Sequence, residues 1–221
     1  MNLDATRAVR EQVAEVARKL AGLGLVAGTA GNASARLPEG HLAITRMGGS
    51  CAGMTADDIA VVDRDLYPVE GDLVPSSESL LHVAIYEARP DVGGIVHTHP
   101  VYASALAVSG VAIPSIVDEM VVALGGEVRV SEYGPPASEE MARRVCEALG
   151  ERDAVLVRNH GAVGVGGTPL EALEAAVLTE RVAQIFVLSS LLGNPGRLPE
   201  DVVTSEVAIF EMRRAVRRPG G

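Results

Sequence analysis

The sequence predicts one α/β domain over residues 1–221, built as a layered sandwich of helices and strands. Of its 221 residues, 48% are hydrophobic and 22% are charged, which is the composition of a globular rather than a disordered chain. Helical and strand patterns intermix along the whole sequence, and no linker or internal repeat separates them. Domains typically have roughly 100–200 residues, so the length also favours one domain.

The first third of the chain predicts a helix followed by strands. Apolar residues recur every three or four positions over Leu3–Gly22, which indicates an amphipathic helix. These residues are Val9, Val13, Val16 and Leu20. The glycine-rich stretch Leu25–Leu37 predicts a bend and then a strand. Two further strands are expected at His41–Thr45 and Ile59–Asp63, and a turn at Asp65–Gly71.

The middle of the chain predicts two helices around a buried strand. A helix is expected from Ser77 to about Arg89, since Pro90 lies just beyond it. Gly93–His99 is a strand that Pro100 ends, and a short helix follows at Tyr102–Val108. Ile113–Leu124 fits either a strand or a helix.

The last third predicts three helices and three strands. Ser138 is the expected N-cap of a helix over Glu139–Leu149. Thr168 and Glu171 form a capping-box pattern with Pro169 between them, so a long helix begins there, and Gly193 ends it. The other expected elements are strands at Val128–Tyr133, Asp153–Arg158 and Ala162–Val165, and a helix at about Ser205–Arg217.

The composition argues against several classes of protein. With 19 basic against 29 acidic residues, no Trp and few aromatic residues, the chain is a poor candidate for nucleic-acid binding. Its two cysteines, Cys51 and Cys146, are no disulfide framework and fit a reducing compartment. The N-terminal residues lack the apolar core of a signal peptide, and the most apolar stretch, Leu170–Leu192, carries several charges. We therefore expect a cytoplasmic protein without a membrane span.

Three of the five histidines are candidate metal ligands. His97 and His99 stand two apart on an expected strand and so point to the same face. His160 lies at another strand end, before Gly161, which permits a tight turn. Three imidazoles and at most one carboxylate suit a catalytic divalent ion such as Zn²⁺. The alternative is a structural or surface role, because a short H-x-H pattern also occurs by chance.

Two segments are candidate anion sites. The glycine-rich bend Gly28–Ser34 could expose backbone N–H groups, with Asn32 as a side-chain donor, although an ordinary turn is the alternative. Ser76 and Ser77 stand at an expected helix N-terminus, where simple capping is the alternative. Glu78 follows them and would matter only if it faced the histidines.

Other polar residues are weaker candidates. Asp118, Glu119, Tyr102 and Tyr133 could each donate or accept a proton, and a structural role is the alternative. The remaining two histidines, His41 and His82, are expected on the surface or on a helix face.

Taken together and in order, five segments resemble the class II aldolase/adducin family, specifically its L-fuculose-phosphate aldolase-like members. The segments are Gly24–Arg36, Thr45–Gly48, Pro75–Ser79, Arg89–Pro100 and Asn159–Gly166. The resemblance implies a three-layer αβα domain around a mixed, mostly antiparallel sheet. It also implies a divalent metal, usually zinc, and a homotetramer with sites at subunit interfaces.

The resemblance further assigns roles to individual residues. His97, His99 and His160 match metal ligands, and Glu78 matches the glutamate that ligates the resting metal and then acts as the acid/base. In the family a group of residues binds the phosphate of the substrate, and we call this group the phosphate cradle. The residues that match it here are Gly31, Asn32, Gly48, Ser76 and Ser77. Met47 replaces a threonine of that cradle. Ile113–Gly126 lacks the family tyrosine that serves as second acid/base and offers Asp118 and Glu119 instead.

The implied reaction is cleavage of a ketose 1-phosphate, such as L-fuculose 1-phosphate, through an enediolate to glycerone phosphate and an aldehyde. A pentulose-5-phosphate 4-epimerase and a sugar-phosphate dehydratase are the enzymatic alternatives on this fold. An adducin-like association module is the non-enzymatic one, but it has no need for the three histidines and Glu78.

Overall fold

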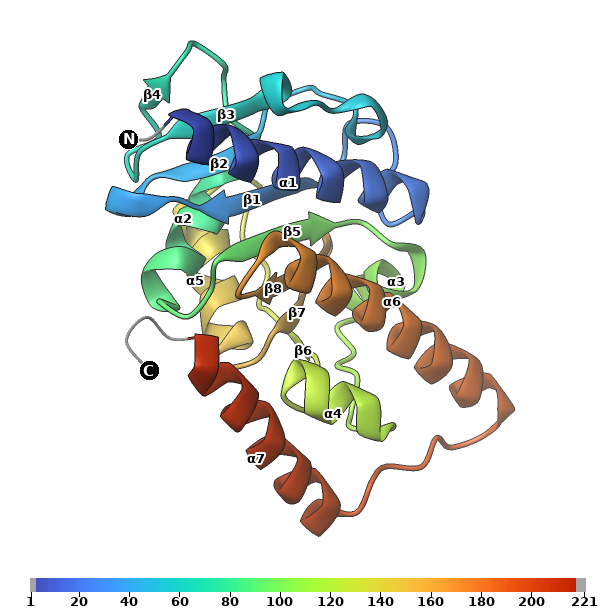
Figure 1. Ribbon diagram of the computed structural model, residues 1–221. Coiled ribbons are helices and arrows are strands. Elements are labelled where there is room, and N and C mark those ends of the chain that lie inside the picture. Colours follow the sequence, from blue (N-terminus) through green and yellow to red (C-terminus); the bar gives the residue numbers. More distant parts are fainter. Residues whose placement is uncertain (1–2, 218–221) are drawn as a thin grey trace.

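A mixed eight-stranded sheet forms the middle of the protein in a computed structural model, which describes residues 3–217 (Figure 1). The strand order is β4-β3-β2-β1-β5-β8-β7-β6, and all neighbouring strands are antiparallel except β6 and β7. The strands are β1 (Asn32–Arg36), β2 (Leu42–Thr45), β3 (Ile59–Val62), β4 (Pro68–Glu70), β5 (Gly94–Thr98), β6 (Arg129–Val130), β7 (Ala154–Val157) and β8 (Gly161–Gly166).

Helices cover both faces of this sheet. One face packs against α1 and α6, and the opposite face packs against α2 and α5 (Figure 1). Over residues 3–217 the α-helices are α1 (Leu3–Gly22), α2 (Ser79–Ala88), α3 (Val101–Ser109), α4 (Asp118–Leu124), α5 (Glu139–Leu149), α6 (Pro169–Leu192) and α7 (Glu200–Arg217). The predicted three-layer αβα arrangement around a mostly antiparallel sheet is therefore confirmed.

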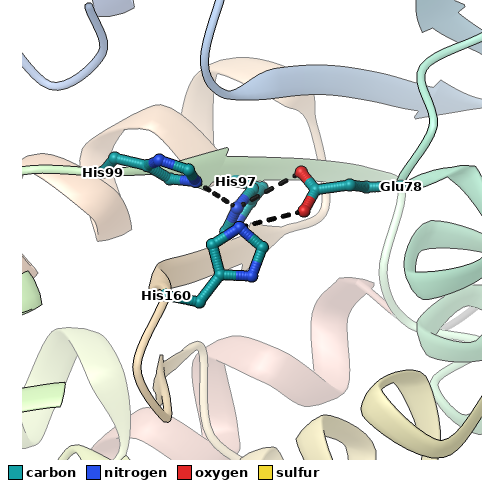
Figure 2. A group of neighbouring side chains, drawn as sticks. All are labelled: Glu78, His97, His99 and His160. Carbon is teal, nitrogen blue, oxygen red and sulfur yellow. Dashed lines mark hydrogen bonds and ion pairs between the residues drawn. The ribbon is translucent and has the colours of Figure 1, made fainter. Parts of the chain in front are cut away.

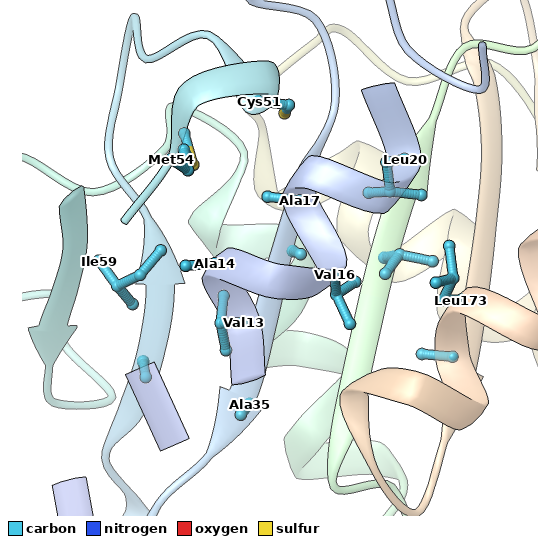
Figure 3. Close-up of a cluster of buried hydrophobic side chains, with 14 of the residues drawn as sticks. Val13, Ala14, Val16, Ala17, Leu20, Ala35, Cys51, Met54, Ile59 and Leu173 are labelled. Atoms are coloured by element: carbon cyan, nitrogen blue, oxygen red, sulfur yellow. The ribbon is translucent and has the colours of Figure 1, made fainter. Parts of the chain in front are cut away.

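Helix α1 packs closely on the sheet because its inner face alternates large and small side chains. Ala14 and Ala17 are fully buried and let the helix approach β1, where Ala33 and Ala35 are also small. Apolar residues of α1, the segment after β2 and α6 complete this cluster (Figure 3). Leu20 is fully buried in it, and a leucine buried in this way contributes about 1.5–3 kcal/mol.

Local signals place several helices where the sequence predicts them. Helix α1 has the predicted bounds, and so does α5, where Ser138 Oγ accepts a hydrogen bond from Met141 N over 3.1 Å. Thr168 caps α6 by accepting from Glu171 N over 3.2 Å. The Glu171 carboxylate, however, accepts from Gly167 N, so only half of the predicted capping box is formed.

Differences from the prediction occur where pairing between distant segments decides the structure. The expected turn at Asp65–Gly71 contains β4, an edge strand that tolerates Pro68 at its start and pairs with β3. The ambiguous stretch Ile113–Leu124 divides, because Ile113 bridges to Val128 while its second half forms α4.

Three other elements have boundaries that differ from those predicted from the sequence. The strand expected at Val128–Tyr133 is reduced to β6, which pairs with β7. Helix α2 begins at Ser79 rather than Ser77, because residues 76–78 form a turn. Helix α7 begins at Glu200 rather than Ser205, and two acidic residues in its first turn favour that start.

Helix α6 is more apolar than expected. By length and composition alone it meets the requirement for a membrane span, with a mean hydropathy of 1.5 over its most apolar window. A core helix meets the same requirement, and the first half of α6 packs against β8 and β5. Its second half carries exposed apolar side chains.

Two arginines of α7 enter a buried acidic cluster. Arg217 pairs with Asp153, and Arg214 lies 3.5 Å from Asp91. Arg89 donates to both oxygens of Asp91 at 2.8 Å and lies 3.4 Å from Asp153. The side chains of both aspartates are at most 4% exposed, so the cluster joins α7 to the sheet through two buried carboxylates.

We expect Asp153→Ala to lower the free energy of unfolding by about 1.5–3 kcal/mol, because Arg217 loses its buried carboxylate while Arg89 keeps Asp91. Urea unfolding at neutral pH measures this loss. Asp57→Ala is the control, since Asp57 forms an exposed pair with Arg7 at 3.5 Å, and no measurable loss is expected there. Equal losses in the two variants would contradict a structural role for the cluster.

Candidate metal centre

Four side chains from three separate parts of the chain converge at one end of β5 (Figure 2). His97 lies on β5, His99 just after it, His160 in the bend between β7 and β8, and Glu78 at the N-cap of α2. One ligating atom from each residue lies within 4.8 Å of the others. The predicted grouping of these residues therefore exists within one chain.

The distances between the side chains are short. His97 Nε2 lies 2.8 Å from His99 Nε2 and 3.3 Å from Glu78 Oε2. His160 Nε2 lies 3.1 Å from Glu78 Oε1. Each pair of imidazole rings is arranged edge to face with centroids 4.7–4.8 Å apart, so the rings surround a common centre instead of stacking.

The pairing of β5 with β8 brings the histidines together. Thr98 is opposite Ala162 in this antiparallel pair, so the end of β5 lies beside the bend that carries His160. Gly161 makes the close approach possible, because a Cβ there would lie 2.2 Å from Thr98 O and 2.9 Å from His99 Cδ2. His99 N donates to Leu25 O over 3.0 Å, which holds the segment after β5 in place.

The hydrogen bond of His97 fixes which of its nitrogens can bind a cation. Its Nδ1 lies 3.0 Å from the carbonyl oxygen of Ala162, which can only accept, so Nδ1 carries the hydrogen. Burial lowers the pKa of His97 to about 3, so the ring is neutral near pH 7. The lone pair of Nε2 is then directed at Glu78 and His99. Metal-binding histidines commonly have such a backbone carbonyl as partner.

Glu78 is ionised although it is only 9% exposed. Burial by itself raises the pKa of its carboxyl group. His97, His160 and the hydrogen bonds from His160 and Asn32 outweigh that effect, so the pKa lies well below its usual range. One carboxylate and three imidazole nitrogens are a donor set that suits Zn²⁺ and similar divalent ions. The residues present therefore fit a metal centre.

The five residues predicted to hold a phosphate are brought together only in part. Asn32 Nδ2 donates to Glu78 Oε2 over 2.7 Å, and Ser76 Oγ accepts from Glu78 N over 3.3 Å. Gly31 precedes Asn32 with a φ of 79°, and a Cβ there would lie 2.8 Å from His97 O. Each of these three residues therefore adjoins the metal cluster.

The other two cradle residues lie on neighbouring segments. Ser76 N donates to Thr45 O, which places the segment that contains Gly48 beside the start of α2. Ser77 is exposed. Within residues 3–217, no hydrogen bond joins Gly48 or Ser77 to the metal cluster.

His82 is a functional candidate that sequence reasoning missed. Of the two expected positions, the surface is wrong, since the ring is fully buried, and a helix face is confirmed, because His82 lies on the face of α2 that packs on β1. It lies 2.5 Å from Asn32 Oδ1 and 2.7 Å from Ser34 Oγ. The available signal was the four-residue spacing from Glu78 to His82 and on to Tyr86, which places all three on one side of α2.

The candidate second acid/base residues do not join this cluster within the described chain. Asp118 interacts with Glu206 of α7, and Glu119 lines a cavity of about 430 Å³ with residues of α6 and α7. Tyr133 is 51% exposed, and the backbone N of Tyr102 donates to the Glu180 carboxylate.

Comparisons with known proteins find a matching family and several relatives. Residues 11–187 match the family described as "Class II Aldolase and Adducin N-terminal domain". The chain is 34% identical over 194 residues to a 5-methylthioribulose-1-phosphate/5-deoxyribulose-1-phosphate aldolase of Rhodospirillum rubrum, covering 88% of this chain and 87% of that one.

Two other comparisons point to the same group of proteins. The chain is 33% identical to an L-ribulose-5-phosphate 4-epimerase of Salmonella paratyphi A, covering 87% of this chain and 90% of the epimerase. A solved structure of an L-fuculose 1-phosphate aldolase is similar with a TM-score of 0.87 and 32% identity, over 92% of this chain and 96% of that one.

Proposed function

The chain belongs to the class II aldolase and adducin family, and from that premise we propose that it is a zinc-dependent lyase for a ketose 1-phosphate. The products are glycerone phosphate and an aldehyde, and L-fuculose 1-phosphate is one substrate of this type. The observation that carries the proposal is the cluster of His97, His99, His160 and Glu78. A non-enzymatic association module would have no use for it.

In this proposal Glu78 has two roles, as a ligand of the metal and as the acid/base residue. A divalent ion held by the three histidines and Glu78 would polarise the substrate carbonyl and stabilise the enediolate formed on cleavage. During cleavage, the hydroxyl on the aldehyde side loses a proton and a carbon of glycerone phosphate gains one. Glu78 starts as an ionised carboxylate, so it would take up the first proton and deliver it as the second. It is the carboxylate of the cluster and lies beside the predicted phosphate cradle.

The phosphate of the substrate is assigned to Gly31, Asn32, Gly48, Ser76 and Ser77. Asn32 uses one hydrogen of its amide for Glu78 and keeps the second for a phosphate oxygen. Ser76 and Ser77 lie before the first turn of α2, whose dipole favours an anion.

We expect Ser77→Ala to raise KM for a phosphorylated substrate roughly ten- to hundredfold, because a hydrogen bond to a charged group contributes about 1.5–3 kcal/mol. KM for the dephosphorylated analogue should change much less. Steady-state kinetics with both substrates measure the difference, and equal effects on both would show that Ser77 does not touch the phosphate. The exposed hydroxyl has no hydrogen bond to Glu78, so the variant leaves the carboxylate undisturbed.

An epimerase remains the second candidate because one relative is named as an L-ribulose-5-phosphate 4-epimerase. Such an enzyme would recombine the two fragments after cleavage instead of releasing them. Coupled assays distinguish the two functions: released glycerone phosphate with free aldehyde supports the lyase, and an epimerised pentulose phosphate without free aldehyde contradicts it.

We also propose a cytoplasmic homotetramer with its sites at subunit interfaces. Apolar side chains exposed on the second half of α6 and on α7 support association; these are Ile185, Leu188, Leu191, Leu192, Ile209 and Met212. Cys51 and Cys146 are free thiols, as expected in a reducing compartment. Light scattering of the purified protein tests the tetramer, and a monomer at micromolar concentration would contradict it.

A further inference from the structure

A chain of buried hydrogen bonds leads from Glu78 into the space between β1 and α2. It runs from Glu78 Oε2 to Asn32 Nδ2 at 2.7 Å, and from Asn32 Oδ1 to His82 Nε2 at 2.5 Å. It continues from His82 Nδ1 to Ser34 Oγ at 2.7 Å and from there to Tyr86 Oη at 2.8 Å. The four residues beyond Glu78 are at most 6% exposed.

This series of hydrogen bonds forms because two residues of β1 and two residues of α2 are spaced by nearly the same distance. Asn32 and Ser34 are alternate residues of β1 and share a face, about 6.6–6.8 Å apart along the strand. His82 and Tyr86 are one turn apart on α2, about 6 Å along its axis. Each strand residue therefore meets its own helix residue, while Ala33 between them faces α1.

The charge of Glu78 determines the direction of every bond in this chain. A carboxylate can only accept, so Asn32 must face it with Nδ2 and must turn Oδ1 toward His82. Oδ1 can only accept, so His82 must carry its hydrogen on Nε2. Nδ1 then accepts from the Ser34 hydroxyl, whose oxygen accepts from Tyr86.

The buried end of this series of hydrogen bonds also restricts the end beside Glu78. A buried neutral imidazole held between Ser34 and Asn32 prevents the Asn32 amide from rotating. Without it, the amide could turn Oδ1 toward Glu78, and two oxygens would then face each other. An apolar residue would fill the space of His82 at a lower desolvation cost, so the presence of a buried polar ring needs a reason beyond packing.

We propose that His82 is a positioning residue, which acts through Asn32 to hold the Glu78 carboxylate toward the metal-ligating histidines. It also sets the second amide hydrogen of Asn32 toward the phosphate cradle, and this second part rests on the proposed function. His82 itself touches neither the metal ligands nor the substrate. Its effect is therefore on the orientation of Glu78 and not on the chemistry directly.

Kinetics of two His82 variants test the proposal. His82→Phe keeps a ring but cannot donate to Asn32, and we expect kcat to fall about 10- to 100-fold, as for other residues that orient metal ligands. His82→Gln can donate to Asn32 and accept from Ser34, so it should recover most of the lost kcat. An unchanged kcat in His82→Phe, or no recovery in His82→Gln, would overturn the proposal.

Ile85→Ala separates positioning from packing. Ile85 is fully buried on the same helix and is not part of the chain of bonds. This variant should lower the melting temperature at least as much as His82→Phe while kcat stays at the parental value. If kcat falls equally in both variants, loss of packing explains the effect and the positioning role is wrong.

The position of the ring hydrogen provides a test without substrate. Nitrogen-15 NMR of the folded protein should show His82 as a neutral ring with its hydrogen on Nε2. A hydrogen on Nδ1, or a charged ring, would overturn the proposal. If the ring has the expected form but no ketose phosphate is cleaved, the proposed function fails while the positioning of Asn32 and Glu78 stands.

Discussion

Glu78→Gln is expected to lower kcat by roughly two to four orders of magnitude, the usual range for loss of a general acid/base. Gln keeps the size of the side chain and can still accept a hydrogen bond from Asn32 Nδ2. It cannot carry the proton or the negative charge. Proton transfer should therefore be slower, and the affinity for a divalent ion should be lower. Binding of the substrate phosphate should persist, because the cradle is unchanged.

Single-turnover kinetics and metal analysis of Glu78→Gln measure these two losses separately. Glu87→Gln is the matched control, since Glu87 is an exposed glutamate on the same helix and should have parental kinetics. If Glu78→Gln turns over at a near-parental rate, the acid/base lies elsewhere. Asp118 and Glu119 would then be the next residues to replace.

His99→Ala is expected to abolish both bound metal and activity. The substitution removes one of three imidazoles whose ligating atoms lie within 4.8 Å of each other and of the Glu78 carboxylate. Catalytic zinc sites hold the ion with three protein ligands. The histidines must hold it by themselves while Glu78 acts as the acid/base, so the loss of one imidazole leaves only two ligands at that stage. Elemental analysis of the purified variant, compared with the parent at equal protein concentration, measures the loss.

A histidine outside the cluster serves as the control for this experiment. His41 is half-buried and does not belong to the metal-binding group, so His41→Ala should retain the parental metal content. Stoichiometric zinc in His99→Ala would show that the cluster is not the metal site. Loss of metal in both variants would point to unfolding, which circular dichroism would detect.

The sequence alone determined the parts of this protein that depend on neighbouring residues. Helices α1 and α5 have the predicted bounds, because helical periodicity and the Ser138 cap act within one or two turns. The pairing of His97 with His99 follows from the two-residue period of a single strand. His160 was a candidate ligand from its position at another expected strand end, and the family resemblance joined it to that pair and added Glu78 as a ligand.

The tertiary structure alone decided which distant segments meet. The β5–β8 pairing sets His160 beside His99, and the packing of α2 on β1 buries His82 against Asn32 and Ser34. Strand β4 likewise exists only because β3 offers it a free edge. Such contacts join residues tens of positions apart, so their formation depends on the packing of the whole sheet and its helices. A pattern within a short window of sequence carries no information on that packing.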